Sequence, residues 1–101
     1  MKDETFKDFI LDQLQSLDGV EARRMFGGYG VYAGEQFFAI ISDGRIYFKT
    51  NESTRKRYAG FGMKPFKPSV KQTLKNYYEV PVDVIEDADL LAQWANEAAQ
   101  L

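Results

Sequence analysis

The sequence of 101 residues contains no cysteine and no histidine. Without cysteine there is no disulfide framework, thiolate nucleophile or cysteine-ligated metal. Without histidine the commonest general base and metal ligand is missing, and with it every Ser-His or Cys-His nucleophile. We therefore expect no catalytic, cofactor-binding or metal-binding residues, and a protein that is not an enzyme. Chemistry by carboxylates, lysine or tyrosine remains as the enzymatic alternative.

Long apolar runs are also missing, because no stretch approaches the roughly 20 residues that a transmembrane helix needs. The first eight residues are polar and charged, unlike a signal peptide. We expect a cytoplasmic protein without membrane contact. Hydrophobic residues make up 45% of the chain, which suits one packed core and therefore a single domain over residues 1–101.

Basic residues gather in one part of the chain. Residues 45–75 hold nine Lys and Arg against Glu52 alone, whereas residues 76–101 hold six acids and no base. The whole chain has a net charge of only −2. Two interpretations of the basic part remain open. It forms a surface for phosphate or for an acidic partner, or it is neutralised by the acidic ends of the same chain.

Hydrophobic periodicity predicts a helix at each end of the chain and a sheet between them. Apolar residues at helical spacing mark a first helix that ends before Gly19 and a last helix that buries Leu91 and Trp94. Three short connections that contain glycine divide residues 20–50 into four strands, and Asp43-Gly44 is the clearest hairpin signal among them.

The segments after residue 50 complete the predicted fold. Asn51 is placed to cap a short helix, residues 62–69 contain two prolines and are predicted to form a loop, and residues 73–80 form a further strand. The fold class is therefore α+β. It has a single antiparallel sheet of about five strands, a four-strand meander plus one, with the N- and C-terminal helices on one face.

Arg24 is predicted to point toward apolar surroundings, because strand alternation puts it on the same face as Val20 and Ala22. A buried arginine must be paired or hydrogen-bonded. We consider an ion pair with a helix carboxylate, a β-bulge that returns the side chain to solvent, and an anion or partner site.

A second candidate site is a surface that combines basic and aromatic side chains. Such surfaces bind single-stranded nucleic acid through stacking and charge, but tyrosine and arginine also favour protein interfaces. The residues expected to form this partner or nucleic-acid surface are Arg45, Tyr47, Lys49, Arg55, Lys75 and Tyr77.

The most specific block of sequence runs from Arg24 to Gly30. It is not a phosphate-binding loop, because Val31-Tyr32 follow where that motif requires Lys-Ser/Thr. Together with Asp43–Thr50 and Tyr77–Pro81, in order and spacing, the block resembles the N-terminal domain of the TfoX (Sxy) family of bacterial competence regulators. The residues that carry this motif are Arg24, Met25, Phe26, Gly27, Gly28 and Gly30.

The resemblance implies a non-enzymatic regulatory module with an α+β fold similar to secretion chaperones, which often form dimers. It further implies control of competence genes through protein contacts, with the cAMP receptor protein as a partner and without a cofactor. Direct nucleic-acid binding is the alternative function. Full-length members carry a C-terminal domain of helix-hairpin-helix character that residues 1–101 do not contain, so we expect a stand-alone N-terminal domain.

Overall fold

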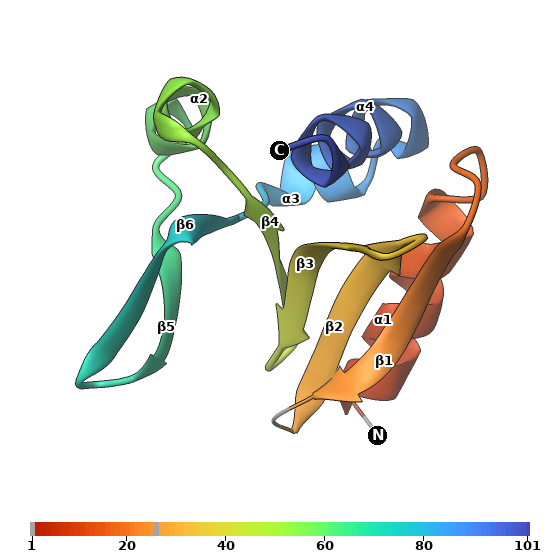
Figure 1. Ribbon diagram of the computed structural model, residues 1–101, viewed down its shortest axis with the longest axis horizontal. Coiled ribbons are helices and arrows are strands. Elements are labelled where there is room, and N and C mark those ends of the chain that lie inside the picture. Colours follow the sequence, from red (N-terminus) through yellow and green to blue (C-terminus); the bar gives the residue numbers. More distant parts are fainter. Residues whose placement is uncertain (1, 26) are drawn as a thin grey trace.

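The computed structural model describes residues 2–25 and 27–101. The described residues form one antiparallel sheet with the strand order β1-β2-β3-β4-β6-β5, flanked by helices (Figure 1). The α+β class is confirmed, with six strands rather than five. The elements are α1 (Lys2–Gln13), β1 (Val20–Met25), β2 (Gly28–Ala33), β3 (Gln36–Ser42), β4 (Arg45–Lys49), α2 (Glu52–Gly60), β5 (Pro65–Ser69), β6 (Gln72–Glu79), α3 (Val82–Ile85) and α4 (Ala88–Ala99).

The additional strand is β5, in the segment for which the sequence predicts a loop. Pro65 and Pro68 favour a loop because proline has no backbone N–H to donate to a neighbouring strand. However, β5 is the last strand of the sheet and pairs with β6 alone. An edge strand needs hydrogen bonds on one side only, so it tolerates both prolines.

The hairpin between β3 and β4 is closed by Asp43 and Gly44, whose φ angles are 52° and 74°. Two consecutive positive φ values are what a type I′ turn requires, which confirms the strongest of the predicted connections. The carboxylate of Asp3 accepts hydrogen bonds from the backbone N–H groups of Asp43 (3.1 Å) and Gly44 (2.7 Å). Helix α1 is therefore tied to the meander at this turn.

The terminal helices cover one face of the sheet, as the sequence predicts (Figure 1). Helix α1 packs against β1, β2 and β3, and α4 packs against β3, β4 and α1. Ile10 of α1 and Leu14, which directly follows this helix, are buried against this face, as are Leu91 and Ala95 of α4. Val31 of the sheet is fully buried there. None of the helices within residues 2–25 and 27–101 has the length and hydropathy of a membrane span.

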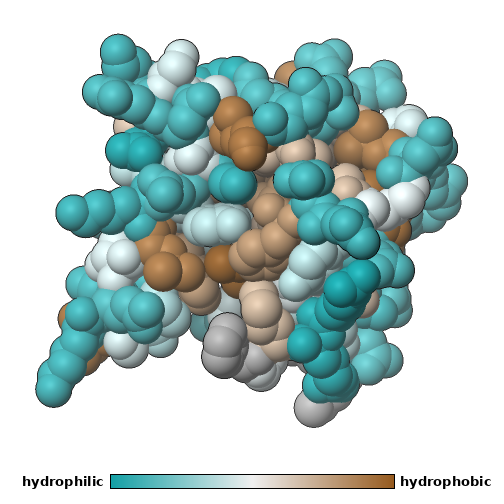
Figure 2. All heavy atoms as spheres, in the orientation of Figure 1, coloured by the Kyte–Doolittle hydropathy of each residue, from teal (hydrophilic) through white to brown (hydrophobic). Residues whose placement is uncertain are grey.

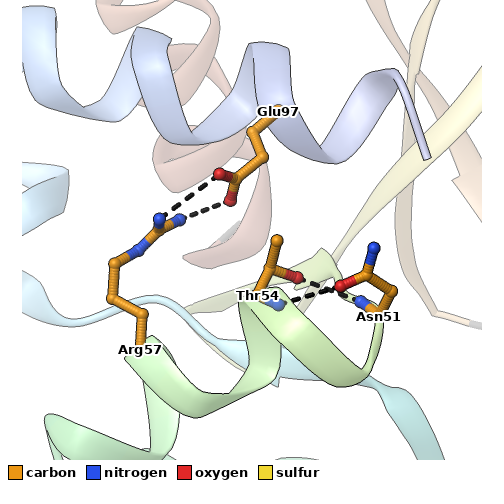
Figure 3. A network of polar contacts seen from close by, with 4 residues as sticks. All are labelled: Asn51, Thr54, Arg57 and Glu97. Atoms are coloured by element: carbon orange, nitrogen blue, oxygen red, sulfur yellow. Dashed lines mark hydrogen bonds and ion pairs between the residues drawn. The ribbon is translucent and has the colours of Figure 1, made fainter.

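Helix α2 is held by its cap and by one ion pair (Figure 3). Asn51 and Thr54 form the capping box, with bonds of 2.8 Å and 3.0 Å between each side chain and the other's backbone N–H. The guanidinium group of Arg57 pairs with Glu97 of α4 and lies 4.3 Å from the centre of the Trp94 ring. Tyr58 of the same helix is 1% exposed and packs against the rings of Trp94 and Tyr78.

Candidate binding groove

The register of the strands shows which residues lie on the face of the sheet opposite the helices. Tyr29 and Ile41 are cross-strand partners on the helix-covered face, so their neighbours Gly30 and Ile40 face the other way. Ile40 is in turn the partner of Tyr47, which pairs across β4 and β6 with Glu79. We call this second side the open face, because the packed helices α1 and α4 lie on the other one.

A groove with a volume of about 470 Å³ lies on the open face. Its lining comes from β1, β2, β3, β5 and β6 and includes the apolar side chains of Met25, Phe37, Ile40, Phe66, Pro68 and Leu74. Figure 2 shows hydrophobic atoms gathered in the middle of the view, with hydrophilic atoms around them. The volume is within the range of about 300 to 1,000 Å³ that is typical of ligand pockets.

The glycines of the Arg24–Gly30 block shape the turn and the floor of this groove. Gly27 has a φ angle of 80°, which favours glycine, in the connection between β1 and β2. A Cβ atom on Gly28 would lie 2.1 Å from the carbonyl oxygen of Ile41, so only glycine allows β2 and β3 to approach this closely. A Cβ atom on Gly30 would lie 2.9 Å from Met25 Cε and from Phe37 Cε1. Met25 and Phe37 therefore meet above Gly30.

Arg24, another residue of the motif, does not line the groove. Phe26 lies outside the described residues. Arg24 shares a face with Val20 and Ala22, as alternation predicts, because it is the cross-strand partner of the buried Tyr29. Its side chain is nevertheless exposed, and the guanidinium carbon lies 5.6 Å from the centre of the Tyr29 ring. Arg24 thus keeps the predicted face but remains in solvent, and it does so on an edge strand whose pairing with β2 has a regular register, without the β-bulge that we considered.

The predicted basic and aromatic surface is brought together in part, since β4 and β6 are neighbouring strands. Lys49 and Tyr77 are cross-strand partners, and Tyr47 lies on the same face of β4 as Lys49. Both tyrosine rings are partly buried, and their burial raises the pKa of each phenol above its ordinary value. The Tyr47 ring centre lies 4.6 Å from that of Phe66, and the Tyr77 ring centre lies 5.6 Å from that of Phe37. The rings are thus engaged with the lining of the groove.

Three of the cations of this predicted surface contact other parts of the chain. Arg45 pairs with Glu79 at 3.0 Å, and Lys49 donates to the backbone oxygen of Leu101 at 3.3 Å. Arg55 donates to the side-chain oxygen of Asn76 at 3.1 Å. Lys75, the remaining member, is exposed on β6.

Lys75 belongs instead to a group on the β5–β6 hairpin. We call Lys67, Lys71 and Lys75 the hairpin lysines. All three are exposed, and in the part of the chain that the structure describes no ion pair joins them to an acid. Neutralisation by the acids of the same chain therefore applies to only part of the basic segment. Arg45 and Arg57 are neutralised by acids of residues 76–101, whereas the hairpin lysines are not.

The far wall of the groove is the feature that sequence reasoning misses. Phe66, Pro68 and Leu74 line it, and two of them lie in the predicted loop. Phe66 and Pro68 alternate with Lys67 and Ser69, and this period of two is a strand signal that the prolines conceal. Residues from five strands meet here, so only the tertiary structure reveals the groove.

Comparison with known proteins identifies the family. The sequence matches the TfoX N-terminal domain over residues 12–101. It is also 30% identical over 80 residues to the DNA transformation protein TfoX1 of Aliivibrio fischeri. The aligned region covers 77% of this chain and 36% of that relative, so the chain spans about a third of the curated relative's length. With the matched region covering most of the described fold, the chain belongs to the TfoX N-terminal domain family.

Proposed function

We propose that this chain is a non-enzymatic regulatory module that controls genes for DNA uptake and acts through protein contacts on its open face. The observation that carries the proposal is the apolar groove of about 470 Å³ on the face that the packed helices α1 and α4 leave free. Concave, mostly apolar sites of this volume are where proteins commonly bind a ligand or a group of a partner. Family membership and the name of the Aliivibrio fischeri relative support the link to DNA transformation.

The cAMP receptor protein bound at its promoters is the first complex to test, because the sequence resembles competence regulators that act with it. A cytoplasmic location and a contact between two copies of the chain are further parts of the proposal. Direct nucleic-acid binding is the second candidate, supported by the exposed hairpin lysines.

A complementation experiment tests the role in regulation. A strain without this gene receives the wild-type gene, the groove variant Leu74→Arg or the control variant Lys56→Glu, whose site lies exposed on α2 away from the groove lining. Transcripts of DNA-uptake genes and transformation frequency are measured. We expect the wild type and Lys56→Glu to restore both, and Leu74→Arg to restore neither at equal protein level. Full restoration by Leu74→Arg contradicts a role for the groove, and no effect of deleting the gene contradicts the regulatory role.

Gel-shift measurements with the purified protein test the second candidate. Binding to single- or double-stranded DNA at low salt that weakens steeply as salt is added would favour direct contact with nucleic acid. A lack of any shift would leave protein contacts as the route of action.

A further inference from the structure

We propose that the groove binds an acidic amphipathic helix of a partner protein, with the hairpin lysines contacting its carboxylates. This inference rests on the proposed function, since it specifies the kind of partner that the open face recognises. The inference depends on three observations. They are the apolar lining of the groove, the positive charge on the hairpin beside it, and the pairing of the strands that supply the lining.

The apolar lining provides the contact for the partner's hydrophobic side chains. Met25, Phe37 and Ile40 form one side, and Phe66 and Leu74 form the other. Methionine and phenylalanine side chains suit adaptable peptide-binding surfaces, because methionine is flexible and polarisable and phenylalanine offers a large contact area. A volume of about 470 Å³ has room for several apolar side chains of a partner.

Positive charge gathers on the β5–β6 hairpin, whose other residues supply one wall of the groove. The hairpin lysines are exposed and stand outside the lining that Phe66, Gln72 and Leu74 supply, so they can meet a partner only beyond the edge of the groove. No Asp or Glu occurs from residue 53 to residue 78. Glu79, the first acid after this stretch, is already paired with Arg45. Lysines without an acidic neighbour beside an apolar groove favour a partner that carries carboxylates beside its apolar residues.

The position of the groove on the face of the sheet determines the form of the partner. Strands β2, β3 and β6 supply most of the lining and pair with a neighbour on both sides, so a segment seated over them finds no open strand edge. Of the two edge strands that border the groove, β5 contains Pro65 and Pro68 and therefore lacks two of the backbone N–H groups that strand addition uses. A partner segment must then present its apolar side chains on one side without backbone pairing. An amphipathic helix does this with residues spaced three and four positions apart.

Nucleic acid fits these observations less well. Binding of single strands relies on exposed aromatic rings on which bases stack. Tyr47 and Tyr77 are partly buried against Phe66 and Phe37. Their rings support the lining, and the groove presents an apolar surface rather than a stacking platform.

Fluorescence anisotropy with a labelled synthetic peptide tests the inference. The probe is a helical peptide of about 14 residues, with Leu and Phe on one side and Glu on the other. Control peptides replace Leu and Phe by Ser, or Glu by Lys. We expect binding of the first peptide only. Lys67→Glu combined with Lys71→Glu weakens it about tenfold, Leu74→Arg weakens it more, and Lys56→Glu leaves it unchanged within about twofold.

Chemical-shift mapping by NMR locates the bound peptide. Support requires that the amides of Met25, Phe37 and Leu74 shift on titration. No binding, equal binding of the Lys peptide, shifts confined to other surfaces, or tighter binding of single-stranded DNA to these amides overturns the inference. Dimerisation through the groove, seen by sedimentation and abolished by Leu74→Arg, overturns it in favour of a second copy of the chain. Peptide binding without any effect of Leu74→Arg on transcription would instead contradict the proposed function alone.

Discussion

At the residue scale, Gly28 controls how closely two strands approach. A Cβ atom added there would lie 2.1 Å from a backbone oxygen of β3, and a backbone atom cannot move aside as a side chain can. We expect Gly28→Ala to lower the free energy of unfolding by about 3 kcal/mol, because β2 and β3 must separate. Urea denaturation followed by circular dichroism measures the change.

Gly60→Ala is the matched control for this substitution. Gly60 ends α2, and an added Cβ atom there meets no heavy atom within 4 Å. The alanine should stabilise the protein by about 0.5 kcal/mol, since it restricts the unfolded chain. Equal unfolding midpoints for the two variants would show that the approach of β2 and β3 is not limiting.

The sequence predicts the turns better than it predicts the exposure of single side chains. Positive φ at Gly27 and at Asp43-Gly44 follows from local preference, which a sequence pattern contains. The exposure of Arg24 depends on which strand lies at the edge, and that is a property of the assembled sheet. The face of Arg24 is thus predictable, and its burial is not.

At the scale of elements, the bond between α1 and the β3–β4 turn joins two distant parts of the chain. Asp3 accepts two backbone hydrogen bonds there, and an asparagine offers a single acceptor oxygen. We expect Asp3→Asn to destabilise the fold by about 1 kcal/mol and to speed hydrogen exchange at the Gly44 amide. Native-state exchange measured by NMR reports both effects.

Glu4→Gln serves as the control, because it removes the same charge from the same first turn of α1. Its effect on the Gly44 amide should be negligible. If both variants speed exchange at Gly44 equally, the effect is one of helix charge and not of the bond to the turn.

Strand β5 shows why one element escapes prediction. Its five residues include two prolines, and local preference therefore opposes a strand. Pairing with β6 overrides that preference, and the register shifts twice along this pair. Because β5 supplies one wall of the groove, the same override conceals the candidate site. The meander and its buried third strand, in contrast, follow from alternation and glycine positions.

At the scale of the whole molecule, the positive charges that are proposed to bind a partner also repel one another, which lowers the stability of the fold. Seven basic residues and no acid lie between residues 53 and 78 of a chain whose net charge is −2. We expect the free energy of unfolding of the Lys67→Glu and Lys71→Glu double variant to equal that of the wild type or to exceed it by about 0.5 kcal/mol. The reason is that repulsion between like charges on the hairpin is removed. The gain should shrink in high salt, where such interactions are screened.

Thermal denaturation at low and at high ionic strength tests this expectation. A double variant that is clearly less stable than the wild type would mean that these lysines support the fold. The single variants Lys67→Glu and Lys71→Glu would then show which lysine supports the fold and which affects only the binding of a partner.

The prolines of β5 have a consequence for how the molecule meets its surroundings. Two of the five residues in this terminal strand lack an amide hydrogen, so a passing strand finds an interrupted template along that border. Fibril-like growth from this side is discouraged even when the protein is abundant. A partner is therefore expected to contact the face of the sheet rather than the edge formed by β5.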